Sequence, residues 1–73
     1  MQQSLLISFI VPAFNAQLTL AGCVGSIVRT MSSCGAGYEV VIVDDGSTDQ
    51  TPALALALAQ QYAEVRVVRQ GNG

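Results

Sequence analysis

The sequence predicts an open α/β fold in which a parallel sheet carries helical connections. Three short runs rich in β-branched and aliphatic residues have the length and composition of buried strands. They alternate with two segments of helical character, which gives the order β-α-β-α-β. Because each connection contains a helix, the strands are expected to run parallel with right-handed crossovers. This is half of a doubly wound, Rossmann-like sheet, and we expect it to be incomplete.

The three predicted strands are apolar runs bounded by breakers and loops. The first is Leu5–Val11, which is apolar on both faces and is expected to end at Pro12. The second is Glu39–Val43, and the third is Val65–Val68. A run that is apolar on both faces is typical of a strand in the middle of a parallel sheet, covered by helices on both sides.

The first predicted helix follows Asn15, a fair N-cap, and ends at a loop over residues 32–37. Its apolar stripe predicts that Cys23 is a small buried hydrophobe. Gly22 and Gly25 weaken the helix by up to about 1 kcal/mol each relative to Ala, and they would allow it to lie close to the sheet. The stripe consists of Leu20, Cys23, Val24, Ile27, Val28 and Met31.

The second predicted helix is capped by either Asp49 or Thr51 and continues to Ala63. Pro52 suits its first turn. Its Ala and Leu residues alternate with a period of two, which formally resembles a strand. Ala and Leu are strong helix formers and the segment is capped, so we predict a helix.

Composition excludes several classes of function. Apolar residues make up 51% of the chain and charged residues 11%, the opposite of a disordered segment. The net charge is −2, and three arginines do not form the basic face that nucleic-acid binding requires. Histidine, the commonest general base and zinc ligand, is absent. Neither a secretory signal nor a membrane span is predicted, so we expect a cytoplasmic location, which for a full-length protein includes the cytoplasmic face of a membrane.

Two polar loops follow the first two predicted strands. Ligands of open α/β sheets bind outside the carboxyl ends of the strands, and adjacent strands lie about 4.8 Å apart, so the loops should be neighbours. A prolyl turn with an aromatic side chain, beside a carboxylate, suits a flat ring that carries N–H donors, such as a nucleobase. Glycine in the second loop permits a turn with positive φ. The loop residues are Pro12, Ala13, Phe14 and Asn15, and Asp44, Asp45, Gly46 and Ser47.

The same residues also have ordinary structural interpretations. An acidic pair before Gly-Ser is typical of a solvated turn followed by a helix cap. Phe14 alone is typical of a core residue, and Asn15 alone of a cap. Arg66 and Arg69, near the last strand, are expected to be solvated.

Taken together, the motifs resemble the family 2 glycosyltransferases, which have the GT-A fold. The resemblance covers essentially the whole chain from Leu6 onward. It implies that residues 1–73 are the N-terminal fragment of such a domain, and that the chain ends before the residues that perform the chemistry. The matching segments are Ser8–Asn15, Cys23–Ile27, Val41–Asp49 with Thr51, and Val65–Gly73.

The resemblance implies that the two loops hold the base of a nucleotide-sugar donor, commonly UDP. Pro12, Ala13 and Phe14 would frame the base, and Asn15 would shape the first loop. The protein would transfer the sugar to an acceptor that this part of the sequence does not identify.

In the second loop, the resemblance implies that Asp45 accepts a hydrogen bond from a ring N–H, with Asp44 supporting it. Gly46 and Ser47 would form the turn beneath. The full-length enzyme is expected to use Mg²⁺ or Mn²⁺, held by an Asp-x-Asp motif that this chain lacks. No residue of this chain is expected to bind the metal, and the chain alone is expected to be inactive.

Two other interpretations remain open. One is a non-enzymatic, receiver-like signalling module in which Asp44 and Asp45 form a magnesium-binding acidic pocket. The other is an inactive remnant of a larger protein. We also expect the first strand to have an unpaired apolar edge through which the chain can self-associate.

Overall fold

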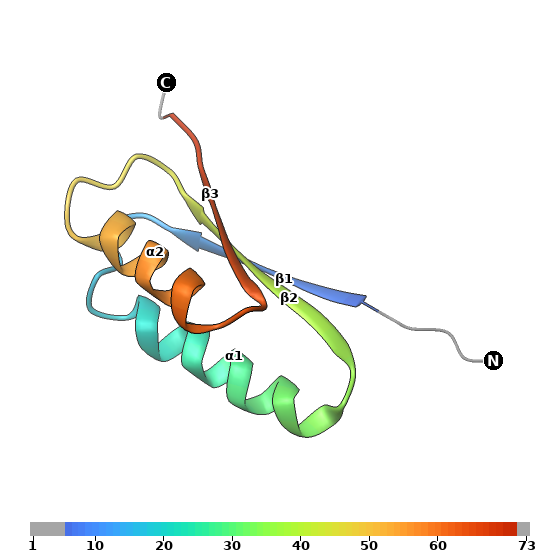
Figure 1. Ribbon diagram of the computed structural model, residues 1–73. Coiled ribbons are helices and arrows are strands. Elements are labelled where there is room, and N and C mark those ends of the chain that lie inside the picture. Colours follow the sequence, from blue (N-terminus) through green and yellow to red (C-terminus); the bar gives the residue numbers. More distant parts are fainter. Residues whose placement is uncertain (1–5, 72–73) are drawn as a thin grey trace.

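The computed structural model describes residues 6–71 and confirms the predicted open α/β fold (Figure 1). The three strands form one parallel sheet, in which they lie side by side in their order along the chain. The predicted strand residue Leu5 and the predicted loop residues Asn72 and Gly73 lie outside the described part. The elements are β1 (Leu6–Ala13), α1 (Leu20–Cys34), β2 (Gly37–Asp44), α2 (Thr51–Gln61) and β3 (Val65–Arg69).

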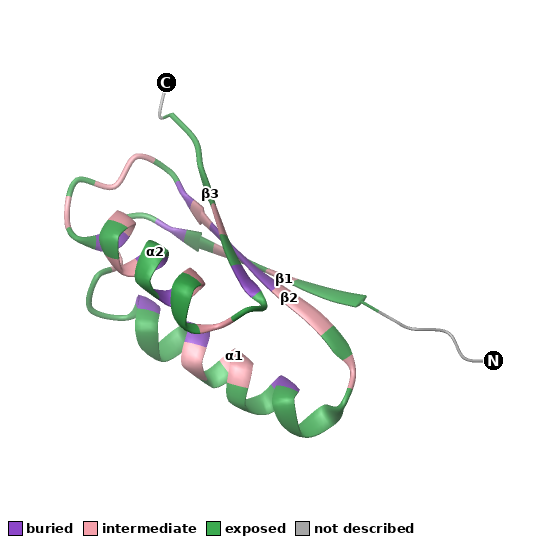
Figure 2. Cartoon of the chain, in the orientation of Figure 1, coloured by how far each residue is buried: buried purple, intermediate pink, exposed green. Residues whose placement is uncertain are grey.

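Both helices cover the same face of the sheet, where α1 and α2 lie side by side (Figure 1). The chain crosses the sheet in one direction from β1 to β3, so two crossovers of the same hand fall on the same side. The expectation that helices cover both faces is therefore wrong for the described residues. The core fills the space between the helices and this face, as the buried positions in Figure 2 show. It contains Ala13, Leu20, Val24, Val40, Ile42, Ala55, Leu58 and Val65.

Strand β1 forms an edge of the described sheet and continues through Pro12 to Ala13, contrary to the predicted end. The carbonyl of Ala13 points toward β2, where it accepts a hydrogen bond from the N–H of Asp45 at 3.2 Å. Because successive residues of a strand direct their backbone groups to opposite sides, the nitrogen of Pro12 points away from β2. Its missing N–H therefore removes no hydrogen bond from the ladder, as is usual for proline in an edge strand.

The face of the sheet opposite the helices carries a polar row across all three strands. The hydroxyl of Ser8 donates to Glu39 Oε2 at 2.6 Å, and Glu39 Oε1 lies 3.4 Å from Arg66 Nε. The hydrogen bond from Ser8 is the main cause that lowers the pKa of Glu39 below its ordinary value. Beside this row, Ile10 of β1 is 60% exposed.

Helix α1 begins at Leu20 with Thr19 as its N-cap residue, so Asn15 does not cap it. The helix extends over the first half of the predicted loop and ends where Gly35 adopts a left-handed conformation, with φ 77°. A glycine in this conformation is a common helix terminator. In this last turn, the hydroxyl of Ser33 donates back to the carbonyl of Arg29 at 3.3 Å.

The apolar stripe of α1 is narrower than predicted. Its centre is buried, but Cys23 is exposed because it lies on the flank of the stripe. A Cβ added at Gly22 would meet nothing within 4 Å, and one at Gly25 would meet only the tip of Arg29 at 3.9 Å. The two glycines therefore do not serve a close approach to the sheet.

Helix α2 confirms the choice of helix over strand for the Ala/Leu segment, although it ends at Gln61 rather than Ala63. Its buried residues are Thr51, Ala55 and Leu58, at steps of four and three residues. This spacing is that of one helical face. Of the remaining leucines, Leu54 packs partly buried against the core and Leu56 is 55% exposed, so the Ala/Leu alternation does not follow the buried face.

Candidate functional site

The two polar loops meet at the carboxyl ends of β1 and β2, as the sequence predicts. Ala13 and Asp44 are paired in the parallel register. Immediately beyond them, the N–H of Asp45 donates to the carbonyl of Ala13. The last pair of the ladder therefore brings the two loops together at one site.

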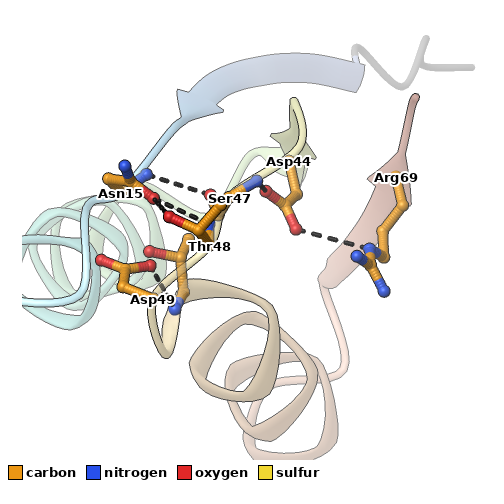
Figure 3. Close-up of polar contacts among 7 residues, drawn as sticks. Asn15, Asp44, Ser47, Thr48, Asp49 and Arg69 are labelled. Atoms are coloured by element: carbon orange, nitrogen blue, oxygen red, sulfur yellow. Dashed lines mark hydrogen bonds and ion pairs between the residues drawn. The ribbon is translucent and has the colours of Figure 1, made fainter. Parts of the chain in front are cut away.

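Asn15 joins the two loops through its backbone and its side chain (Figure 3). Its N–H donates to Ser47 Oγ at 3.0 Å, and its Oδ1 accepts from the N–H of Thr48 at 2.9 Å. Asn15 has a positive φ of 49°, a conformation that asparagine tolerates better than most side chains. The implied role of Asn15 in shaping the loop has a physical basis in these contacts.

A second group of hydrogen bonds ties the start of α2 to the first loop. The N–H of Ala16 donates to Thr51 Oγ1 at 2.8 Å, and the N–H of Gln50 donates to Gln17 Oε1 at 2.9 Å. Asp49 accepts from the N–H groups of Thr51, at 2.9 Å, and Gln17, at 3.4 Å. Asp49 thus receives a first-turn N–H of α2. Hydrogen bonding by Thr51 is the main cause that lowers the pKa of Asp49.

The turn after β2 is built on the buried carboxylate of Asp44, which has no exposed surface. Its Oδ1 accepts from the N–H of Ser47 at 3.1 Å, so Asp44 supports the turn. Gly46 has φ 76°, which confirms the predicted positive φ at this position. The other oxygen, Oδ2, lies 3.4 Å from Arg69 Nε at the end of β3 (Figure 3).

The groups left for a ligand at this edge are those at the surface of the site. Pro12 and Asp45 are exposed, and Phe14 is 56% exposed, so the interpretation of Phe14 as a core residue is wrong. Phe14 lies between Ala13 and Asn15, both of which are hydrogen-bonded to the second loop. An aromatic ring, a proline at the end of β1 and a carboxylate are therefore exposed on segments that backbone hydrogen bonds hold at one edge of the sheet.

The acidic residues of the site do not converge as metal ligands would. Asp44 is directed to Ser47 and Arg69, and Asp49 to Gln17 and Thr51. Within residues 6–71, no group of three or more His, Cys, Asp or Glu side chains could hold a metal ion. The described residues therefore do not fit the metal expected for a full-length enzyme.

Sequence reasoning missed three contributors to the site: Gln17, Thr48 and Arg69. Gln17 and Thr48 act through hydrogen bonds between the two loops, which no local sequence pattern indicates, although Thr48 lies within the matching segment Val41–Asp49. Arg69 could have been found from strand register, because it ends β3 where Asp44 ends β2, and the two are paired in the ladder.

The fold and this site define an open α/β domain in which hydrogen bonds hold two polar loops together at the carboxyl ends of the strands. The sequence profile described as glycosyl transferase family 2 matches residues 8–73 of the chain. The chain belongs to this family. Family membership also decides against the receiver-like alternative.

Individual relatives agree with the family. A beta-monoglucosyldiacylglycerol synthase of Synechocystis is 49% identical over 53 residues, which cover 68% of this chain and 11% of that protein. The uncharacterized glycosyltransferase EpsJ of Bacillus subtilis is 34% identical over 68 residues, which cover 93% of this chain and 19% of that protein. A dolichyl-phosphate beta-glucosyltransferase of Mus musculus is 36% identical over 69 residues, which cover 85% of this chain and 21% of that protein. The chain thus spans about a tenth to a fifth of the length of these relatives.

None of the helices formed by the described residues is both long and apolar enough to cross a membrane.

Proposed function

We propose that this chain provides the nucleotide-binding part of a glycosyltransferase that uses a UDP-sugar as donor. The observation that carries the proposal is the junction of the two loops, where the Ala13–Asp45 backbone hydrogen bond and the contacts of Asn15 hold both loops, with their exposed groups, at one edge of the sheet. Membership in the glycosyl transferase family supports sugar transfer as the activity of the whole protein.

Each exposed group has a role that its chemistry suits. The carboxylate of Asp45 is an acceptor only, so it selects a base edge that presents an N–H, such as N3 of uracil. Phe14 and Pro12 offer apolar surface to the flat ring. Gly46 adopts the positive φ of the turn and has no side chain, so the backbone can pass close beneath the base.

In the whole protein, a bound Mg²⁺ or Mn²⁺ would supply charge stabilisation for the departing diphosphate. The residues of this chain would bind and orient the base, and we propose that the chain alone transfers no sugar. The acceptor is not assigned.

Titration of the chain with UDP, followed by amide chemical shifts, tests the proposal. We expect shifts at Phe14, Asn15 and the 45–47 turn, and weaker effects with CDP, whose base has no N–H at ring position 3. Asp45→Ala should weaken UDP binding by roughly tenfold, the cost of one charge-assisted hydrogen bond. Glu64→Gln, an exposed acid at the opposite end of β3, is the matched control. Unchanged shifts in the 45–47 turn of a folded sample would overturn the proposal.

A further inference from the structure

Asp44 is the only charged side chain that is buried within residues 6–71. Its two carboxylate oxygens have different partners. Oδ1 accepts the hydrogen bond from the N–H of Ser47, whereas Oδ2 forms no hydrogen bond among the described residues. A buried carboxylate oxygen without a partner is costly, so the nearby charge of Arg69 must compensate for it.

Arg69 reaches Asp44 from the neighbouring strand. Its Nε lies 3.4 Å from Oδ2, an ion-pair distance, and the two residues are partners in the parallel register (Figure 3). The next residue of the chain, Gln70, donates its N–H to the carbonyl of Asp44 at 3.0 Å. The end of β3 is thus attached to Asp44 at two points, one on the side chain and one on the backbone.

We propose that Arg69 is a positioning residue for nucleotide binding, acting through Asp44 on the turn that presents Asp45. The guanidinium of Arg69 pairs with Oδ2, so that Oδ1 remains hydrogen-bonded to the N–H of Ser47. The two contacts together fix the orientation of the carboxylate. Without it, the carboxylate rotates or recruits water, and the turn loses the support that sets the position of Asp45. The inference rests on the proposed function, and it assigns no direct nucleotide contact to Arg69.

The chain contains a matched control in Arg66. Both arginines lie on β3, both place Nε 3.4 Å from a carboxylate oxygen, and their side chains are 63% and 61% exposed. The partner of Arg66 is Glu39, whose side chain is 29% exposed, whereas Asp44 is fully enclosed. Removing Arg66 therefore removes the same charge from the same strand without touching the turn.

The experiment compares the dissociation constant for UDP among the unsubstituted chain and the variants Arg69→Met, Arg69→Lys and Arg66→Met, with circular dichroism to verify folding. We expect Arg69→Met to weaken UDP binding by about tenfold, because it leaves a buried carboxylate unpaired. Arg69→Lys should restore binding to within about threefold, since it retains the positive charge. Arg66→Met should change binding by less than about twofold, as expected for an exposed pair.

The outcomes separate this inference from the proposed function. If the unsubstituted chain binds no UDP, the proposed function is wrong and the inference falls with it. If it binds UDP and Arg69→Met binds equally well, or Arg66→Met loses as much, the inference alone is overturned.

A double-mutant cycle with Asp44→Asn tests whether Arg69 acts through Asp44. Asparagine has no charge to compensate, so adding Arg69→Met to Asp44→Asn should change UDP affinity by less than about twofold. This pair remains informative where Arg69→Met alone folds poorly, because neither variant leaves a buried charge unpaired. A further loss of about tenfold in the double variant would contradict the inference.

Discussion

Asn15 Oδ1 accepts a hydrogen bond from the N–H of Thr48 at 2.9 Å, across 33 positions of the chain. This contact connects the loop after β1 to the loop after β2, and the N–H of Asn15 makes a second connection to Ser47. The same residue holds a left-handed backbone conformation. One residue, through its backbone and its side chain, therefore connects the two loops and carries the left-handed turn of the first.

Substitution of Asn15 should separate its backbone role from its side-chain role. Asn15→Ala loses the hydrogen bond to Thr48, about 1 kcal/mol, and strains the left-handed backbone by about 1–2 kcal/mol more. Asn15→Gly should lose only the first contribution, since glycine adopts positive φ freely. Thermal unfolding of the two variants measures the difference. Equal stability of the two would show that the left-handed backbone carries no cost here.

The Asp49 network should weaken under acid conditions. Because hydrogen bonding lowers the pKa of Asp49 from its ordinary value of 3.8, its contribution to stability is complete above that value. The contribution is lost as the pH falls through the lowered pKa, so the window lies below pH 3.8. We expect the amide signals of Gln17 and Thr51 to shift together in that window.

Asp49→Asn should remove this acid-dependent step. Glu39, whose pKa is also lowered, from 4.5, needs a separate control, and Glu39→Gln should leave the shifts of Gln17 and Thr51 unchanged. A step that persists in Asp49→Asn would assign the transition to another group.

Substitution by alanine should change the stability of the chain in opposite directions at the two glycines within α1 and at the glycine that ends it. Gly22→Ala and Gly25→Ala should each stabilise the chain by up to about 1 kcal/mol, because the added Cβ finds space and the helix gains propensity. In a domain of this size, 1 kcal/mol raises Tm by about 4–8 °C. Gly35→Ala, at φ 77°, should lower Tm instead. A decrease in Tm for Gly22→Ala would reveal a contact that the described structure lacks.

The free edge of β1 predicts self-association. The strand carries no charged residue, its one proline stands near its end, and Leu6 and Ile10 are 65% and 60% exposed, so most of this edge is unprotected. Ile10→Lys should shift the chain toward a monomer in sedimentation equilibrium. Val68→Lys on β3, a strand already bearing two arginines, is the control and should have less effect. A compact monomer for the unsubstituted chain would contradict this prediction.

Local patterns were sufficient to predict the elements but not all of their ends. The Ala/Leu segment forms α2 because residue type outweighs its alternation. Pro12 did not end β1, since a proline at a free edge costs no ladder hydrogen bond. The first half of the predicted loop over residues 32–37 is helix, because the left-handed Gly35, and not the small polar residues before it, sets the end of α1.

The sequence by itself determined the order of elements, the parallel sheet, the neighbouring polar loops and the turn at Gly46, because each depends on residue type and short-range spacing. Only the tertiary structure decided that both helices share one face, that Asn15 joins two loops rather than capping α1, and that Arg69 compensates the buried charge of Asp44. These features depend on strand order and register, which bring together residues that are distant in the chain and that no local pattern connects.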